Sequence, residues 1–152
     1  MNLIDNLKKH KLELPELTVQ GGSYVSVNIR VNIAYVAIQF PIKNKVYLYQ
    51  GKLGNNLSTQ DGYKAMELCA LNVIAQIHAK ISFENVIGLN HIDAYYQSSK
   101  NWDDAPTVVN GASDVFVNIL EEKGEHSRSI FGVQNLPRNF GVGLTATFTI
   151  KT

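Results

Sequence analysis

Residues 142–150 read Val-Gly-Leu-Thr-Ala-Thr-Phe-Thr-Ile, and an apolar side chain occupies every second position of this stretch. Such alternation is typical of a β-strand that turns one face to a hydrophobic core and the other face away from it. The preceding segment, residues 127–133, begins with small polar residues around an arginine and continues as an apolar run. We therefore expect the end of the chain to supply two strands of one sheet.

A long helix is predicted between residue 58 and residue 80. Ser58 and Asp61 have the spacing of a capping box, in which the acid bonds the backbone at the start of the helix. The helix is expected to end near Lys80. Its predicted buried face is an apolar stripe formed by Met66, Cys69, Ala70, Val73, Ile74, Ile77 and Ile81.

A second helix is predicted further along the chain. Asp103 or Asp104 is expected to be its N-cap, and Pro106 falls in its first turn, where the missing backbone N–H has no partner in any case. Gly124 is expected to end this segment in a left-handed conformation, which glycine adopts without a steric penalty. Its predicted buried face is formed by Val108, Val109, Ala112, Val115, Phe116, Ile119 and Leu120.

Further strands are predicted before and between the helices. Residues 24–30 alternate like the last strand, and residues 33–40 form a nearly continuous apolar run, which is typical of a strand buried on both faces. Pro41 is expected to end this run, because proline cannot donate to a neighbouring strand. Residues 45–49 are predicted to be a short strand, and residues 86–95 a longer one.

The predicted order of strands and helices indicates an α+β fold. Right-handed connections would place both helices on one face of a mixed sheet. Because residues 33–40 are apolar on both sides, we expect a homo-oligomer to cover the other face. Residues 1–16 are expected to be an N-terminal extension, and residues 17–152 a single domain. The extension is predicted to contain one helical turn through Leu3, Ile4 and Leu7.

The composition argues against several classes of protein. The chain has 152 residues, of which 45% are hydrophobic and 18% charged, as in globular domains. Its net charge of +1 provides no basic excess, so nucleic acid is an unlikely partner. No apolar run has the length of a signal-peptide core or of a membrane span, and the expected location is therefore the cytoplasm.

Neither a metal nor another cofactor is expected. The four histidines have no metal-ligand spacing, and no glycine-rich phosphate loop is present. The single cysteine, Cys69, excludes an internal disulfide bond and is expected to be a buried structural thiol on the apolar stripe of the first long helix.

Arg128 is the most informative polar residue. It lies between Ser127 and Ser129 at the start of an apolar strand, where its guanidinium group needs water or a charged partner. The planar group suits a ligand carboxylate, which it can hold through two parallel hydrogen bonds. It can equally pair with one of the chain's own acids, and position alone leaves both interpretations open.

Three other residues are candidates for a site. Tyr24 follows two glycines and can either lean over a ligand or cover the edge of the core. Asn110, early in the second helix, can cap the helix, bond a ligand or remain solvated. Trp102, in the loop before that helix, suits either a lid or an interface.

Several of these segments resemble the Rid family, also called YjgF-type proteins, and in particular a longer-chain branch of it. Residues 126–137, His-Ser-Arg-Ser-Ile-Phe-Gly-Val-Gln-Asn-Leu-Pro, resemble the family signature Ala-Arg-Ser-x-x-x-Val-x-x-Leu-Pro. Residues 21–25 are similar to the opening Gly-x-Tyr strand, residues 49–58 to the loop and cap before the first helix, and residues 109–114 to the start of the second helix. The resemblance covers residues 15 to 150.

The resemblance implies a chorismate-mutase-like fold and a homotrimer with sites between subunits. It implies hydrolysis of enamines and imines to 2-keto acids and ammonia, with Arg128 holding the substrate carboxylate and Tyr24 and Asn110 lining the cleft. Ile130 stands where the family has a cysteine, and its backbone carbonyl would remain available.

The sequence also departs from the family pattern. Active deaminases carry a Glu-x-Glu pair on the last strand, and these places are Gly143 and Thr145 here. A Ser-Gly-Gln on the second strand corresponds to residues 37–39, Ala-Ile-Gln. The primary hypothesis is an imine or enamine deaminase that works by positioning. The alternative is a non-enzymatic binding module for a small carboxylate, and an endoribonuclease ranks third.

Overall fold

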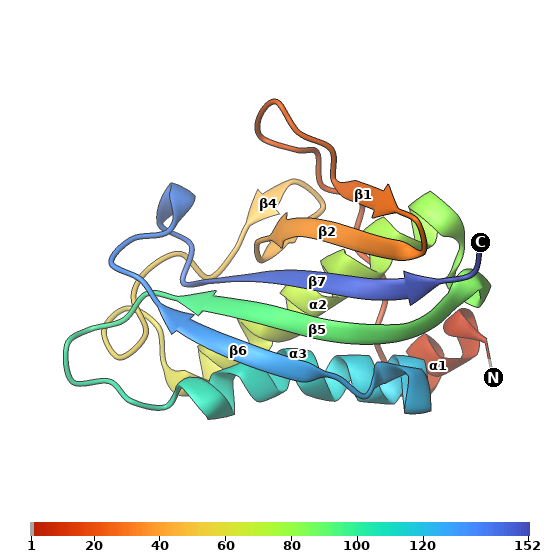
Figure 1. The fold of residues 1–152 in the computed structure, drawn as a ribbon. Helices are drawn as coiled ribbons and strands as arrows, with labels where there is room; N and C mark the ends of the chain where they lie inside the picture. Colours follow the sequence, from red (N-terminus) through yellow and green to blue (C-terminus); the bar gives the residue numbers. More distant parts are fainter. Residues whose placement is uncertain (1) are drawn as a thin grey trace.

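The computed structural model describes residues 2–152 and shows a mixed five-stranded sheet with helices on one face (Figure 1). The strands are β1 (Val27–Arg30), β2 (Ile33–Gln39), β5 (Val86–Tyr96), β6 (Ser127–Gly132) and β7 (Val142–Ile150). Their order in the sheet is β1-β2-β7-β5-β6, so β1 and β6 form the two edges. The neighbours β5 and β6 run parallel, whereas the other pairs are antiparallel. The predicted α+β class is confirmed.

Three α-helices accompany the sheet, namely α1 (Leu3–Lys9), α2 (Thr59–Ile81) and α3 (Ala105–Leu120). The long helices α2 and α3 lie side by side on one face of the sheet, as the sequence predicts (Figure 1). Short 3-10 helices follow α2, α3 and β6 at Phe83–Asn85, Glu121–Gly124 and Pro137–Asn139. Among the described helices, none is long and apolar enough to cross a membrane.

The start of α2 has the predicted capping box. The Oγ of Ser58 accepts a hydrogen bond from the backbone N–H of Asp61 at 3.0 Å, and the Asp61 carboxylate accepts one from the N–H of Ser58 at 2.9 Å. These two bonds satisfy backbone donors that the helix itself leaves without partners. The predicted stripe then packs on the sheet, and Cys69 is completely buried there, as expected.

Helices α2 and α3 come unusually close to each other at Gly111. A Cβ atom at this position would lie 2.1 Å from the carbonyl oxygen of Tyr63 on α2, so only glycine fits. Asp104 occupies the N-cap position of α3, although its side chain accepts a hydrogen bond from Thr59 on α2 at 3.2 Å and does not cap its own helix. The first two turns of α3, which include Asn110, are therefore fixed relative to α2.

The prediction that Gly124 adopts a left-handed conformation to end the second helix is wrong. The residue at the C-cap of α3 with a positive φ is Glu121, at 59°. Gly124 ends the following 3-10 turn with φ outside the left-handed range, and a Cβ there would lie 2.2 Å from the carbonyl oxygen of Phe116. Glycine is required at this position for space and not for a left-handed backbone.

Two predicted strands are shorter than expected. The first begins at Val27 and not at residue 24, because the N–H of Tyr24 bonds the carbonyl of Gly22 in a turn and Val25 is exposed. The segment predicted at residues 45–49 pairs locally: β4 (Val46–Tyr47) forms a separate two-stranded hairpin with β3 (Ile42–Lys43). Residues 41–49 therefore turn away from the main sheet.

Strand β2 is buried on one face in the single chain, and not on both as predicted. Ala34 and Val36 face the helices, whereas the side chain of Tyr35 is 48% exposed on the opposite face of the sheet. That face also carries His91, which bonds Ser127 at 2.7 Å and Asp93 at 3.0 Å. The described chain leaves this face uncovered (Figure 1).

The N-terminal helix α1 packs against the end of α3. Leu3 and Leu7 are buried, Ile4 is exposed, and the buried side-chain amide of Asn6 donates to the carbonyl of Ile119 at 2.7 Å. The helix ends at Lys9 with His10 as its C-cap, and the next residue, Lys11, has a φ of 57°. The N–H groups of Lys11 and Leu12 donate back to the carbonyls of Lys8 and Leu7, at 3.1 and 2.8 Å, in a Schellman motif.

The buried side chain of Gln97, just after β5, connects three loops. Its Nε2 donates to the carbonyl of Gly51 and to the Oδ1 of Asn139, both at 2.8 Å, and its Oε1 accepts from the N–H of Leu136 at 2.8 Å. Since Gln97 is only 1% exposed, these bonds replace its contacts with water. The loops around residues 51, 97 and 136–139 are therefore joined at one point.

Candidate functional site

Arg128 lies on the edge strand β6 and points to the same side of the sheet as the helices. It stands beside the fully buried Ile92 of β5. Its Nη1 donates to the Oδ1 of Asn110 at 2.9 Å and to the Oγ of Ser113 at 3.1 Å, and its Nη2 donates to the carbonyl of Pro106 at 3.4 Å. The strand supplies the guanidinium group, and the first half of α3 supplies its acceptors.

All three acceptors of Arg128 are electrically neutral. No acid lies within ion-pair distance of its guanidinium group in residues 2–152, so the interpretation in which one of the chain's own acids neutralises it is wrong. A guanidinium group has five donors, and three are used here. Two donors and the full positive charge remain for an anion, and Arg128 is partly exposed to solvent.

Ser113 and His126 extend this network, and sequence reasoning did not identify either of them. The Oγ of Ser113 lies 2.9 Å from Nε2 of His126, whose Nδ1 contacts the carbonyl oxygen of Gly124. A carbonyl oxygen can only accept, so the proton of a neutral ring lies on Nδ1, and Nε2 accepts from the Ser113 hydroxyl. The hydroxyl oxygen thereby keeps a lone pair directed at Arg128.

One sequence signal could have identified Ser113. It lies three residues after Asn110 in α3, and residues at this spacing share a helix face. Both residues are polar, so together they mark a polar edge beside the predicted apolar face of the helix. His126 carries no comparable signal, because its role depends on the path of the chain after Gly124.

Ile130 lies on the same side of the sheet as Arg128, two residues along β6, and pairs with Ala94 of β5. Gly143 and Thr145 lie on the opposite side, since their neighbour Leu144 pairs with Ala94 and Thr145 itself pairs with Asp93. Within one chain, the positions of the family's acids are therefore separated from Arg128 by the thickness of the sheet.

The space beside Gly143 is filled by apolar side chains. A Cβ atom there would lie 2.8 Å from Cδ1 of Ile38 and 2.9 Å from Cε1 of Phe40, both contributed by the β2 segment. The ring of Phe40 in turn stacks on Phe140, with 4.9 Å between the centroids. A carboxylate side chain at position 143 would have to displace this packing.

Tyr24 lies at the other edge of the sheet, before β1, and does not meet Arg128 in the same chain. Its hydroxyl accepts a hydrogen bond from the N–H of Gly21 at 3.0 Å, and its side chain is 47% exposed. It lines a cavity of about 570 Å³, whose walls also include Ile38, Phe40, Tyr47, Arg138 and Phe140. The structure thus brings Arg128, Asn110 and Ile130 together and leaves Tyr24 apart.

Trp102 is neither an open lid nor a free surface residue in the chain. Its indole N–H donates to the Oγ1 of Thr59 at 3.0 Å, and its ring packs edge-on against Tyr96 at 5.3 Å. The half-buried ring therefore holds the loop before α3 onto the start of α2.

The chain is similar to known proteins over nearly its whole length. The sequence model of a protein family described as "YjgF/chorismate mutase-like, putative endoribonuclease" matches residues 5–148. Protein TCP17 of Trypanosoma cruzi is 29% identical over 93% of this chain and 89% of its own length.

Two solved structures are close in fold. One is a protein of Shewanella oneidensis described as "a putative endoribonuclease", with 27% identity, a TM-score of 0.96 and coverage of 99% of this chain and 100% of its own. The other is Atu1372 of Agrobacterium tumefaciens, described as having unknown function, with 28% identity, a TM-score of 0.91 and coverage of 97% and 91%.

Proposed function

Because the chain belongs to the YjgF/chorismate mutase-like family, we propose that it binds a small 2-imino acid through Arg128 and accelerates its hydrolysis. The observation that carries the proposal is the guanidinium group with neutral acceptors and two remaining donors. E. coli TdcF, which has the same fold at 17% identity and a TM-score of 0.61, was crystallised with bound serine, a small carboxylate.

The chemistry needs little from the protein beyond position. Water adds to the carbon of the C=N bond, a proton moves to the nitrogen, and ammonia leaves as the C=O bond of the 2-keto acid forms. Arg128 would hold the substrate carboxylate through two parallel hydrogen bonds, while Asn110 and Ser113 fix the guanidinium group. Holding the imine in one orientation lowers the activation barrier of its hydrolysis, and this effect does not require an acidic side chain on β7.

A homotrimer is part of this proposal. Arg128 and Tyr24 lie at opposite edges of the sheet, so a second copy would have to contribute one of them to a shared site. The uncovered sheet face with Tyr35 and His91 would be the surface that the other subunits cover. The single buried thiol, Cys69, suits a cytoplasmic location.

The first experiment measures imine hydrolysis. 2-Iminopropionate or 2-iminobutyrate is generated in solution, and the surviving imine is trapped with semicarbazide. We expect faster loss of the trapped imine with the wild-type protein than with Arg128→Ala or with buffer. Arg30→Ala is the matched control, because Arg30 bonds only Asn28 and its own strand and should behave like wild type. Equal rates for wild type and Arg128→Ala would exclude the proposed reaction.

Subunit mixing tests the shared site. Tyr24→Phe and Arg128→Ala would each be impaired alone, but unfolding and refolding them together should restore part of the activity, because some sites would contain both native residues. No gain over the separate variants, or a monomer in sedimentation, would contradict the assembly.

The second candidate is a binding module for a small carboxylate, with no catalysis. The packing of Ile38 and Phe40 against Gly143 favours it, since the space of a water-activating acid is occupied. Its signature would be Arg128-dependent binding of pyruvate or 2-oxobutyrate without any change in imine lifetime. An endoribonuclease has the least support, because a net charge of +1 provides few phosphate contacts.

A further inference from the structure

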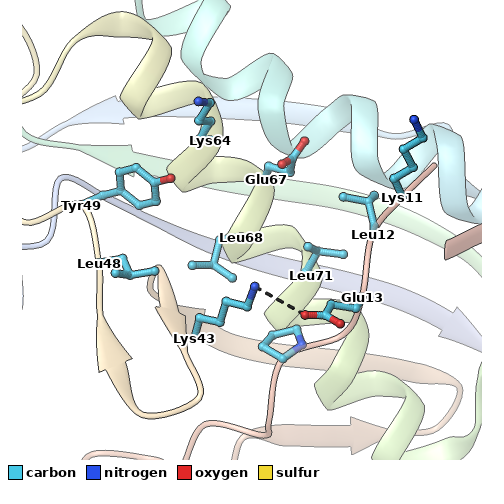
Figure 2. A pocket seen from close by; sticks show the side chains of 11 residues that line it. Lys11, Leu12, Glu13, Lys43, Leu48, Tyr49, Lys64, Glu67, Leu68 and Leu71 are labelled. Carbon is cyan, nitrogen blue, oxygen red and sulfur yellow. Dashed lines mark ion pairs between the residues drawn. The ribbon is translucent and has the colours of Figure 1, made fainter. Parts of the chain in front are cut away.

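A second cavity, of about 540 Å³, lies on the helix side of the molecule (Figure 2). It is formed by residues 11–15 of the N-terminal segment, the β3–β4 hairpin and one face of α2. Leucines form much of its lining, among them Leu68 and Leu71 of α2. None of the residues around Arg128 lines it, so it is independent of the proposed deaminase site. Its volume is in the range of small-molecule pockets.

The polar groups around this cavity are unevenly paired. Lys43 and Glu13 lie 3.5 Å apart and neutralise each other, as the dashed line in Figure 2 shows. Lys11, Lys64 and Glu67 surround the same cavity, and within residues 2–152 none of them has an ion-pair partner or a side-chain hydrogen bond. Two positive charges and one negative charge without ion-pair partners therefore lie at the rim of a partly apolar cavity.

Glu67 is the most constrained of these groups. Its carboxyl group is half-buried on α2, and burial raises its pKa above the usual range, while nearby Lys64 opposes this shift. A carboxylate that loses hydration gains from a cationic hydrogen-bond donor. Tyr49, on the other side of the cavity, is a neutral phenol whose pKa is also raised by burial, so its hydroxyl can donate at neutral pH.

The backbone at Lys11 provides a second, independent observation. Lys11 has a φ of 57° and stands at the position of the Schellman motif where glycine is usual. A lysine has a steric cost in this left-handed conformation, which eight other non-glycine residues of the described chain also adopt. Glycine would suit this backbone better than lysine. What lysine contributes in its place is a long cationic side chain at the rim of the cavity.

We propose that this cavity binds an α-amino acid with an apolar side chain. Lys11 and Lys64 hold its carboxylate, Glu67 accepts hydrogen bonds from its ammonium group, and its side chain lies on the leucines. A simple anion would be repelled by Glu67, and a simple cation by the two lysines, so a zwitterion fits the charges best.

The test uses three probes of nearly the same shape. They are L-leucine, 4-methylpentanoate, which lacks the ammonium group, and L-leucinamide, which lacks the carboxylate. Binding is followed by NMR of the full chain with labelled leucine methyl groups, where Leu68 and Leu71 report directly on the cavity. We expect L-leucine to shift these methyl signals and to bind about tenfold more tightly than either analogue, the factor of one lost charge-assisted bond.

Two variants separate binding from folding. Lys11→Gly should keep or raise the melting temperature, because glycine relieves the left-handed backbone, yet weaken L-leucine binding about tenfold. Glu67→Gln should weaken L-leucine binding and improve that of 4-methylpentanoate. Lys80→Gln and Glu84→Gln, which lie outside the cavity, are the matched controls, and Arg128→Ala should leave the affinity unchanged.

The proposal has two clear refutations. If 4-methylpentanoate binds the wild-type protein as tightly as L-leucine, the cavity is an anion site and not an amino-acid site. If L-leucine leaves the methyl signals of Leu68 and Leu71 unmoved, or if Lys11→Gly and Glu67→Gln both retain wild-type affinity, these residues form no such site.

Discussion

Gly143 on β7 lies directly against Ile38 on β2, and a Cβ atom at position 143 would come within 2.8 Å of its Cδ1. Ile38 is larger than the glycine of the family pattern, and Gly143 lacks the acidic side chain of that pattern. The two differences thus belong to one packing arrangement. Restoring an acid at position 143 while Ile38 is kept would therefore create a clash.

The first prediction concerns this pair. Gly143→Ala should lower the free energy of unfolding by about 1–3 kcal/mol, since the added methyl group overpacks the site. Combined with Ile38→Ala, which opens the space, it should cost less than the sum of the two single changes. Denaturant unfolding of all four proteins gives the coupling energy. Strict additivity would show that the contact is not energetically important.

The second prediction concerns the network behind Arg128. Ser113→Ala removes an acceptor of the guanidinium group and the donor to His126, so the affinity for a small carboxylate should fall about two- to tenfold. Ser113→Thr keeps the hydroxyl group and should restore most of the affinity. Titration with 2-oxobutyrate compares the two variants. Similar losses in both would mean that the hydroxyl does not position Arg128.

The third prediction concerns alkaline pH. The hydroxyl of Tyr63 donates to Asp114 at 2.6 Å, which raises the pKa of Tyr63 from its ordinary 10.0 to about 12. The folded state thus favours the neutral phenol. This stabilisation is fully present below pH 10 and is lost as the pH rises towards 12.

Tyr63→Phe isolates this effect. At neutral pH the change should lower the free energy of unfolding by about 0.5–1 kcal/mol, the net worth of one partly exposed hydrogen bond. Between pH 10 and pH 12 the difference from wild type should shrink, as the wild type loses the bond. Urea unfolding at several pH values measures it. A difference that grows with pH would reverse the sign and contradict the assignment.

The fourth prediction concerns Cys69. The thiol is completely buried, and burial raises its pKa far above the usual range, so it should not react with Ellman's reagent in the folded protein. It should react fully once the protein is unfolded in urea. Cys69→Ser should cost about 1–3 kcal/mol, because the more polar hydroxyl group would lose its contacts with water among apolar side chains. Rapid labelling of the native protein would show that the helix opens locally.

The helices and the last strand were predictable because their signals are local. The Ser58–Asp61 capping box and the strict alternation of residues 142–150 each lie within a few residues of chain, and both occur in the structure as expected. The early strands were less predictable. The turn made by Tyr24 and Gly22, and the exposed face of β2, depend on contacts that no short pattern encodes.

The candidate site was predictable only in part. The charge of Arg128 and its place at the start of a strand indicated an anion site, and the family resemblance added Asn110. The hydrogen bond between Arg128 and Asn110 joins residues 18 apart in sequence, so spacing alone could not reveal it. The role of His126 depends on a 3-10 turn after α3, and the strain at Lys11 depends on its backbone angle.

The side chain of Gln97 has a practical consequence for engineering the protein. The segment that carries Arg138 and Phe140 forms part of the wall of the Tyr24 cavity, and Gln97 ties this segment to the loop at Gly51. Exchanging one of these loops with that of a relative would leave a buried amide group without its partners. Loop grafts meant to alter ligand preference should therefore transplant all three segments together, as one exchangeable unit.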